Sequence, residues 1–148
     1  MQKLIKGRGS QFNPANRFEE IYIDRASGEY DEYFENNNED KKIETVFYND
    51  HSQSILSKNE SPDVGAGFSI NPYRGCEHGC IYCYAMPTHE YLGFSSGLDF
   101  ETKIMVKKDA AKLLEEAFSK KSWKPQSIIF SGNTDCYQPV ERRLGITR

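Results

Sequence analysis

The hydrophobic positions of this chain are spaced in ways that predict one clear helix and several short strands. Between residues 109 and 121 the apolar residues recur at the helical intervals i, i+3, i+4, i+7 and i+8, which places them on one face. These residues are Ala110, Leu113, Leu114, Ala117 and Phe118. Short β-rich or alternating runs predict strands at 45–48, 68–71, 103–107 and 127–130.

From residue 68 onward the predicted strands alternate with helices. A short helix is expected within 81–92, and a last helix is expected to begin near Gln138 and Pro139. Alternation of this kind is typical of a parallel α/β sheet or barrel, in which ligands gather at the carboxyl ends of the strands. Two loops, at 75–84 and 131–135, follow strand ends, so we expect them to share one site.

The part of the chain before residue 67 has a different character. Residues 18–23 could form a short strand, but in 24–42 carboxylates outnumber basic residues and large apolar residues are almost absent. Such composition is typical of a solvated spacer. We therefore expect residues 1–66 to be a partly disordered N-terminal extension and residues 67–148 to form the folded core.

Length and charge narrow the class of protein. A chain of 148 residues allows one ordinary domain. The formal net charge of −3 argues against a broad electrostatic nucleic-acid binder. The chain has neither an apolar run long enough for a membrane span nor an N-terminal signal-peptide pattern, which predicts a cytoplasmic protein.

The cysteines carry the strongest chemical signal. Cys76, Cys80 and Cys83 lie within eight residues of one another, and Cys136 lies far away. Disulfides usually close larger loops, whereas a metal or a cluster needs thiolates that converge. The residues alone leave two metal sites open: an iron–sulfur cluster, or a structural zinc completed by His78 or Cys136.

The spacing C-x3-C-x2-C suits a cubane cluster with three protein ligands. Three thiolates hold three corners and leave the fourth iron free to bind a small ligand. Gly75 and Gly79 allow the backbone to fold tightly around the sulfurs. The remaining candidates, His51, His89 and Cys136, are interpreted as ordinary hydrogen-bonded or buried residues.

The sequence around these cysteines resembles the radical S-adenosylmethionine (radical SAM) superfamily. Residues 71–85 read NPYRGCEHGCIYCYA, with the aromatic Tyr82 just before the third cysteine, and resemble the spore photoproduct lyase-like ("DNA repair photolyase") branch. The strings HEYLG at 89–93, DFETK at 99–103 and SGNTD at 131–135 are similar to the same branch. The resemblance runs from about residue 67 to the C-terminus, and 7–18 is similar to one subgroup.

The resemblance implies a [4Fe-4S] cluster held by Cys76, Cys80 and Cys83. It also implies reductive cleavage of S-adenosyl-L-methionine to methionine and a 5′-deoxyadenosyl radical, with Tyr82 packed by the cluster or the adenine. The methionine end would bind a loop formed here by Ser131, Gly132, Asn133 and Asp135, which departs from the common Gly-Gly-Glu form. Electrons would come from a donor such as flavodoxin or ferredoxin.

The implied fold is a partial (βα) barrel truncated after about three strand–helix units. The chain is therefore expected to be a fragment, or a truncated, non-catalytic remnant that keeps an iron–sulfur or zinc site. The substrate stays open. DNA is one candidate, but the basic residues that could bind it are scattered near the two ends of the chain: Lys3, Lys6, Arg8, Arg142, Arg143 and Arg148.

Overall fold

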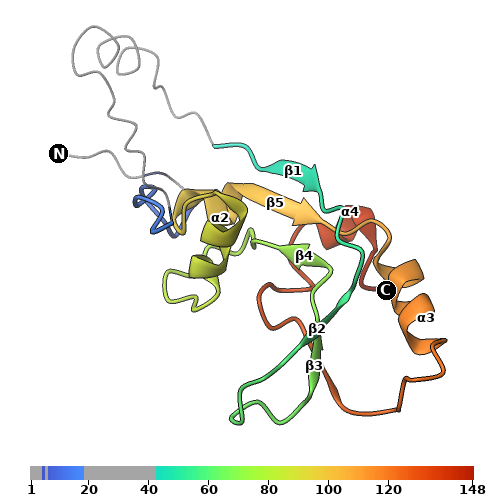
Figure 1. Ribbon diagram of the computed structural model, residues 1–148. Helices are drawn as coiled ribbons and strands as arrows, with labels where there is room; N and C mark the ends of the chain where they lie inside the picture. Colours follow the sequence, from blue (N-terminus) through green and yellow to red (C-terminus); the bar gives the residue numbers. More distant parts are fainter. Residues whose placement is uncertain (1–4, 6, 19–42) are drawn as a thin grey trace, which may run out of the picture.

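Two three-stranded sheets organise the chain (Figure 1). The computed structural model describes residue 5 and residues 7–18 and 43–148. In the first sheet, β1 (Val46–Asn49) runs parallel to β5 (Lys103–Val106), and β4 (Tyr73–Arg74) pairs antiparallel with the other edge of β5. Each strand is only two to four residues long.

The second sheet contains the strand that precedes the loop at 131–135. Its centre is β3 (Phe68–Ile70), which pairs antiparallel with β2 (Leu56–Lys58) and parallel with β6 (Ile128–Phe130). Ile70 and Phe130 are partners in the register, so β3 and β6 end side by side. The loop at 131–135 starts from that edge, whereas β4 of the first sheet lies between β3 and the loop at 75–84.

Four short helical elements connect and cover the sheets (Figure 1). They are the 3-10 helix η1 (Met86–Leu92) and the α-helices α2 (Leu98–Thr102), α3 (Ala110–Phe118) and α4 (Glu141–Leu144). The apolar face of α3 packs on the second sheet, where Ala110 joins the buried Ile55 and Ile70. A second apolar cluster lies under the cysteine loop, where Cys76 meets Ala85 and Phe100.

Most of the predicted elements are confirmed, with shorter bounds. The strands expected at 45–48, 68–71, 103–107 and 127–130 correspond to β1, β3, β5 and β6, and the expected helices correspond to η1, α3 and α4. The helix expected over 109–121 ends at Phe118, and the Asp109 side chain makes no capping hydrogen bond. The short elements β2, β4 and α2 were not anticipated from the sequence.

Both sheets are mixed, although a parallel sheet was expected. β2 runs antiparallel to β3, and β4 runs antiparallel to β5. The loop between β2 and β3 closes with a hydrogen bond from the Asn59 amide to the Gly67 carbonyl (2.9 Å). The barrel itself stays a prediction.

Strands on both sides of residue 66 belong to the same sheets, since β1 pairs with β5 and β2 pairs with β3. The proposed division of the chain at that residue stays a prediction. The expected disordered stretch at 24–42 and most of the strand expected at 18–23 lie outside the described residues. Within the described part of the chain, no helix has the length and apolar character needed to cross a membrane.

Candidate functional site

The cysteine loop, residues 75–84, follows β4 directly and turns at two glycines in the left-handed region. Gly75 has φ = 84° and Gly79 has φ = 63°. Residues with a Cβ atom rarely adopt this conformation, so the backbone here depends on glycine. The sequence predicted that these two glycines would let the loop turn tightly, and the structure confirms it.

The Cys76 end of the cysteine loop is fixed in the core. Cys76 is 8% exposed, and its backbone amide donates to the Phe100 carbonyl of α2 (3.0 Å). Gly75 lies so close to α2 that an added Cβ would be 2.8 Å from the Phe100 carbonyl oxygen. This end of the loop is therefore in direct backbone contact with α2.

The pKa of the Cys76 thiol is affected by its burial and by groups of two different loops. Burial raises the pKa of the Cys76 thiol, whereas the backbone N–H groups of His78 and Asp135 hydrogen-bond to the sulfur and lower it. The nearby Asp135 and Cys83 charges raise the pKa further. Amide donors aimed at a cysteine sulfur are typical of thiolates that ligate metal, because metal binding removes the thiol proton.

The loop after β6 lies against the cysteine loop and Asn71 through hydrogen bonds that each join a side chain to a backbone group. Asn133 donates its amide to the Asn71 side chain (2.9 Å), and the Thr134 hydroxyl donates to the Gly75 carbonyl (2.7 Å). The Tyr84 hydroxyl donates to the Gly132 carbonyl. The structure thus brings together the two loops that the sequence predicted to share a site.

Gln138 joins the same two loops from a fully buried position. Its Nε2 donates to the Gly75 carbonyl (3.2 Å), and its Oε1 accepts from the Glu77 amide (3.1 Å). It therefore ties the residues that flank Cys76 to the start of α4. Sequence reasoning used Gln138 only to mark a helix start and missed this role.

Ser131 begins the second loop in a strained conformation. Its φ of 65° lies in the left-handed region, although it is not a glycine. Its amide donates to the Ile70 carbonyl (2.8 Å), and its buried hydroxyl has no hydrogen-bond partner among the described residues. Asp135 pairs with His78 across the two loops, with 3.2 Å between Oδ2 and Nε2.

The other half of the cysteine loop faces solvent. Cys80 is exposed and Cys83 is half-buried beside Cys76 and Ala85. The Tyr82 side chain is 86% exposed. The structure therefore brings Cys76, Cys83 and the Asp135 backbone together, and it leaves Cys80 and Tyr82 on an open surface.

The donor set consists of free thiols, which can ligate either an iron–sulfur cluster or a zinc ion. All four cysteines are free thiols, which agrees with the expectation against disulfides. Within residues 7–18 and 43–148, no three His, Cys, Asp or Glu side chains converge closely enough to hold one metal ion. A single zinc would bring its sulfurs to within about 4 Å of one another, whereas a cubane separates them because each sulfur binds a different iron.

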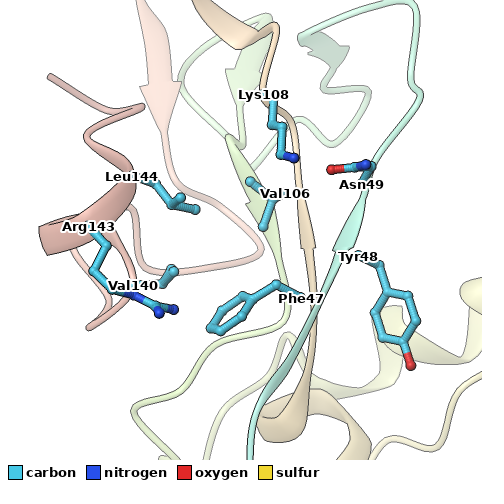
Figure 2. A pocket seen from close by; sticks show the side chains of 8 residues that line it. All are labelled: Phe47, Tyr48, Asn49, Val106, Lys108, Val140, Arg143 and Leu144. Carbon is cyan, nitrogen blue, oxygen red and sulfur yellow. The ribbon is translucent and has the colours of Figure 1, made fainter.

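Two cavities in the described part of the chain are lined by residues other than the cysteines. One, of about 250 Å³, opens where β1 and β5 end, and α4 closes it from the other side (Figure 2). Its lining residues are Phe47, Tyr48, Asn49, Val106, Lys108, Val140, Arg143 and Leu144. The other, of about 400 Å³, is polar and borders Asp50, His51 and Lys107. The candidate site is therefore a surface formed by two loops.

Comparison with known proteins adds relatives but no activity. The uncharacterized proteins Rv2578c of Mycobacterium tuberculosis and Mb2609c of Mycobacterium bovis are each 41% identical to this chain over 91 residues, 60% of the chain and 27% of the relative. The uncharacterized protein MJ0683 of Methanocaldococcus jannaschii is 29% identical over 84 residues, 57% of the chain and 29% of the relative. No protein-family model and no solved structure matches the chain. The chain spans less than a third of the length of these relatives, and their names state no function.

Proposed function

We propose that this chain carries a radical SAM site in which Cys76, Cys80 and Cys83 hold a [4Fe-4S] cluster. The observation that supports the proposal most is the contact between the cysteine loop and the loop after β6 beside the buried Cys76, where the Thr134 hydroxyl donates to the Gly75 carbonyl (2.7 Å) and Asp135 pairs with His78 (3.2 Å). The backbone amides of His78 and Asp135 lower the pKa of Cys76 against the larger effect of burial, and amide donors of this kind tune a bound cluster. Three ligands from one loop leave one iron without a protein ligand, as the chemistry requires.

When bound, the cluster would supply the electron that cleaves the carbon–sulfur bond of S-adenosyl-L-methionine to methionine and a 5′-deoxyadenosyl radical. The chain's own residues would bind and orient that molecule. Asn133 and Asp135 follow β6 at the edge where β3 also ends, beside Cys76. Their polar groups suit the amino and carboxylate groups of the methionine end. The partial barrel, and an electron donor such as flavodoxin or ferredoxin, belong to the same proposal.

Metal analysis of the anaerobically purified protein tests this function. We expect about four irons and four sulfides per chain. Cys80→Ala is the sharpest variant, because Cys80 is exposed and its loss leaves the core packed. It should remove most of the iron, whereas Cys136→Ala, the matched control, should keep it. Stoichiometric zinc without sulfide would contradict the proposal and favour the closed, non-catalytic site.

The open iron is tested separately by electron paramagnetic resonance of the reduced protein. Added S-adenosyl-L-methionine should change the spectrum of the wild-type protein. Asp135→Ala removes the carboxylate but keeps the amide that reaches Cys76, so it should weaken the response without loss of iron. An unchanged wild-type spectrum at saturating S-adenosyl-L-methionine would indicate a cluster with no open position.

A further inference from the structure

The N-terminal segment, residues 7–18, lies beside the cysteine loop and α2, although more than fifty positions separate it from them in sequence (Figure 1). Its closest approach is at Gly9. A Cβ added to Gly9 would lie 1.9 Å from the Gly79 carbonyl oxygen, which real side chains do not allow. The two backbones are therefore in direct contact at the residue just before Cys80.

The Glu101 carboxylate of α2 contacts both backbones at this point. It is 1% exposed and accepts hydrogen bonds from the Gly9 amide (3.2 Å) and the Ser10 amide (2.7 Å). A buried carboxylate is stable only when such donors satisfy it. The Oε2 atom that accepts from Gly9 also lies against Gly79, where an added Cβ would be 2.9 Å from it. One side chain thus contacts both the N-terminal segment and the cysteine loop.

Arg8 fixes the start of this segment. Its guanidinium donates to the Glu101 backbone carbonyl (3.0 Å), to the Ile43 carbonyl (2.8 Å) and to the Thr45 hydroxyl (3.0 Å). Glu101 also directly follows Phe100, whose carbonyl binds the Cys76 amide. Two consecutive residues of α2 therefore support the two halves of the cysteine loop.

The Cys80 half needs that support more than the Cys76 half does. Cys76 is held by the core, but Cys80 is exposed and follows a glycine in the left-handed region. A loop that must be ordered when its ligand binds loses affinity through the conformational entropy of that ordering. A contact that orders the loop beforehand removes part of this cost.

We infer that Glu101 is a positioning residue, which acts through Gly9 and Ser10 to hold the Gly79–Cys80 part of the cysteine loop at the spacing from Cys76 that a shared cluster requires. The inference rests on the proposed function for the identity of the bound group. The contact itself involves only residues of this chain. The N-terminal segment is then part of the site rather than an appendage to it.

The first test uses the metal-free protein and hydrogen exchange read by mass spectrometry. Glu101→Ala should accelerate exchange of the peptide that covers 77–83. Asn13→Ala is the matched control, because Asn13 holds the same segment to α2 through a reciprocal pair with Asp99 (2.9 Å each way) but does not touch the cysteine loop. It should leave 77–83 unchanged. Equal exchange of 77–83 in wild type and in Glu101→Ala would overturn the inference.

The second test uses cluster-loaded protein. Loss of a residue that orients a metal ligand costs roughly tenfold or more in metal affinity, so Glu101→Ala should lose iron to a chelator at least several-fold faster than Asn13→Ala. Glu101→Gln keeps one acceptor oxygen and should fall between wild type and Glu101→Ala. The reduced cluster of Glu101→Gln should also give an altered paramagnetic spectrum, which a loss of global stability alone would not produce.

The outcomes separate this inference from the proposed function. A wild-type protein that binds no cluster contradicts the proposed function, and the exchange experiment then decides the positioning role alone. A wild-type protein that binds the cluster, with Glu101→Ala and Asn13→Ala equal in iron loss and in exchange, overturns the inference and leaves the function standing.

Discussion

The two ends of the cysteine loop are held in different ways. At one end Cys76 is buried, its amide bonds to α2, and Gln138 ties its neighbours to the loop after β6. At the other end Cys80 is exposed, and its neighbour Gly79 is covered by the N-terminal segment. The first end belongs to the core of the fold, and the second depends on a segment from the far end of the chain.

This difference shows why a short motif does not define a metal site by itself. All three cysteines lie within eight positions, yet the residues that support them, Gly9, Glu101 and Gln138, come from three other parts of the chain. A ligand loop needs such supports because its own residues bury little apolar surface. We therefore expect variants at the Cys76 end to change the stability of the whole fold, and variants at the Cys80 end to change mainly the site.

The largest effect is expected for Gly75→Ala. The left-handed backbone costs an alanine about 1–2 kcal/mol, and the Cβ would also meet the Phe100 carbonyl oxygen at 2.8 Å and the Ile104 side chain at 3.0 Å. Overpacking of this kind adds roughly 1–3 kcal/mol, so the free energy of unfolding should fall by about 3 kcal/mol in urea denaturation.

Gly93→Ala is the matched control for that variant. Gly93 also has a left-handed φ, of 77°, but nothing lies within 4 Å of its added Cβ. Backbone strain alone should cost it about 1 kcal/mol. If the two alanine variants lose the same stability, the close packing of Gly75 on α2 contributes nothing, and the described contrast between the two ends of the loop is wrong.

Gln138→Leu should have the next largest effect. The leucine fills the buried space but leaves the Glu77 amide unpaired, and it leaves the Gly75 carbonyl with only the Thr134 hydroxyl as a donor. Unpaired buried groups cost about 1–3 kcal/mol, so we expect a loss of about 2 kcal/mol in the free energy of unfolding. The exposed Gln126→Leu should change it by less than about 0.5 kcal/mol. Equal losses in the two variants would show that the buried bonds of Gln138 do not support the Cys76 end.

The sequence predicted the elements whose signal is local. α3 was predicted because five apolar residues share one face, and that face does pack on Ile55 and Ile70. β3 and β6 were predicted as strands and are neighbours in one sheet, but the cysteine loop starts from β4 of the other sheet. The element β4, by contrast, is only two residues long and is a strand because it pairs with the edge of β5. No local sequence pattern predicts that pairing.

The supports of the site were missed for the same physical reason. Glu101 and the amides it binds are more than ninety positions apart, so no spacing rule connects them. Gly9 is one glycine among several, and only its contact with the Gly79 backbone shows why a glycine is needed there. The sequence signal that existed was the resemblance of 7–18 to the same family branch, and it gave no partner for that segment.

The third effect, smaller than the two above, is a pH dependence from His89. Burial lowers the pKa of His89, although its hydrogen bond to the Lys103 carbonyl and the Asp99 charge act in the opposite direction. The fold therefore favours the neutral ring, so this contribution to stability is present above about pH 6.5 and is lost as the pH falls below it. The urea midpoint of the wild-type protein should drop between pH 7 and pH 5.

A variant separates His89 from the carboxylates that also titrate in acid. His89→Phe keeps an aromatic ring beside Phe94 and Phe100 but cannot take up a proton. It should show a weaker decline in the urea midpoint between pH 7 and pH 5, whereas His51→Gln at an exposed position should behave as wild type. The His89 ring lies against Gly75, at 3.1 Å from the position of an added Cβ. If the urea midpoint of His89→Phe declines as steeply with falling pH as that of the wild type, the burial of His89 is not the cause of the pH dependence.

The smallest effect is expected for Tyr84→Phe, at the solvent-facing side of the two loops. The Tyr84 hydroxyl donates to the Gly132 carbonyl, but the side chain is 79% exposed and water can replace that bond. We expect the free energy of unfolding to change by less than about 0.5 kcal/mol, as in Tyr91→Phe, whose ring is similarly exposed and packs on Phe18. Hydrogen exchange of the peptide covering 131–135 should nevertheless be faster in Tyr84→Phe alone, because the bond restrains only that loop. A loss as large as that of Gln138→Leu would mean that the exposed and the buried contacts support the site equally, which the burial of these two side chains argues against.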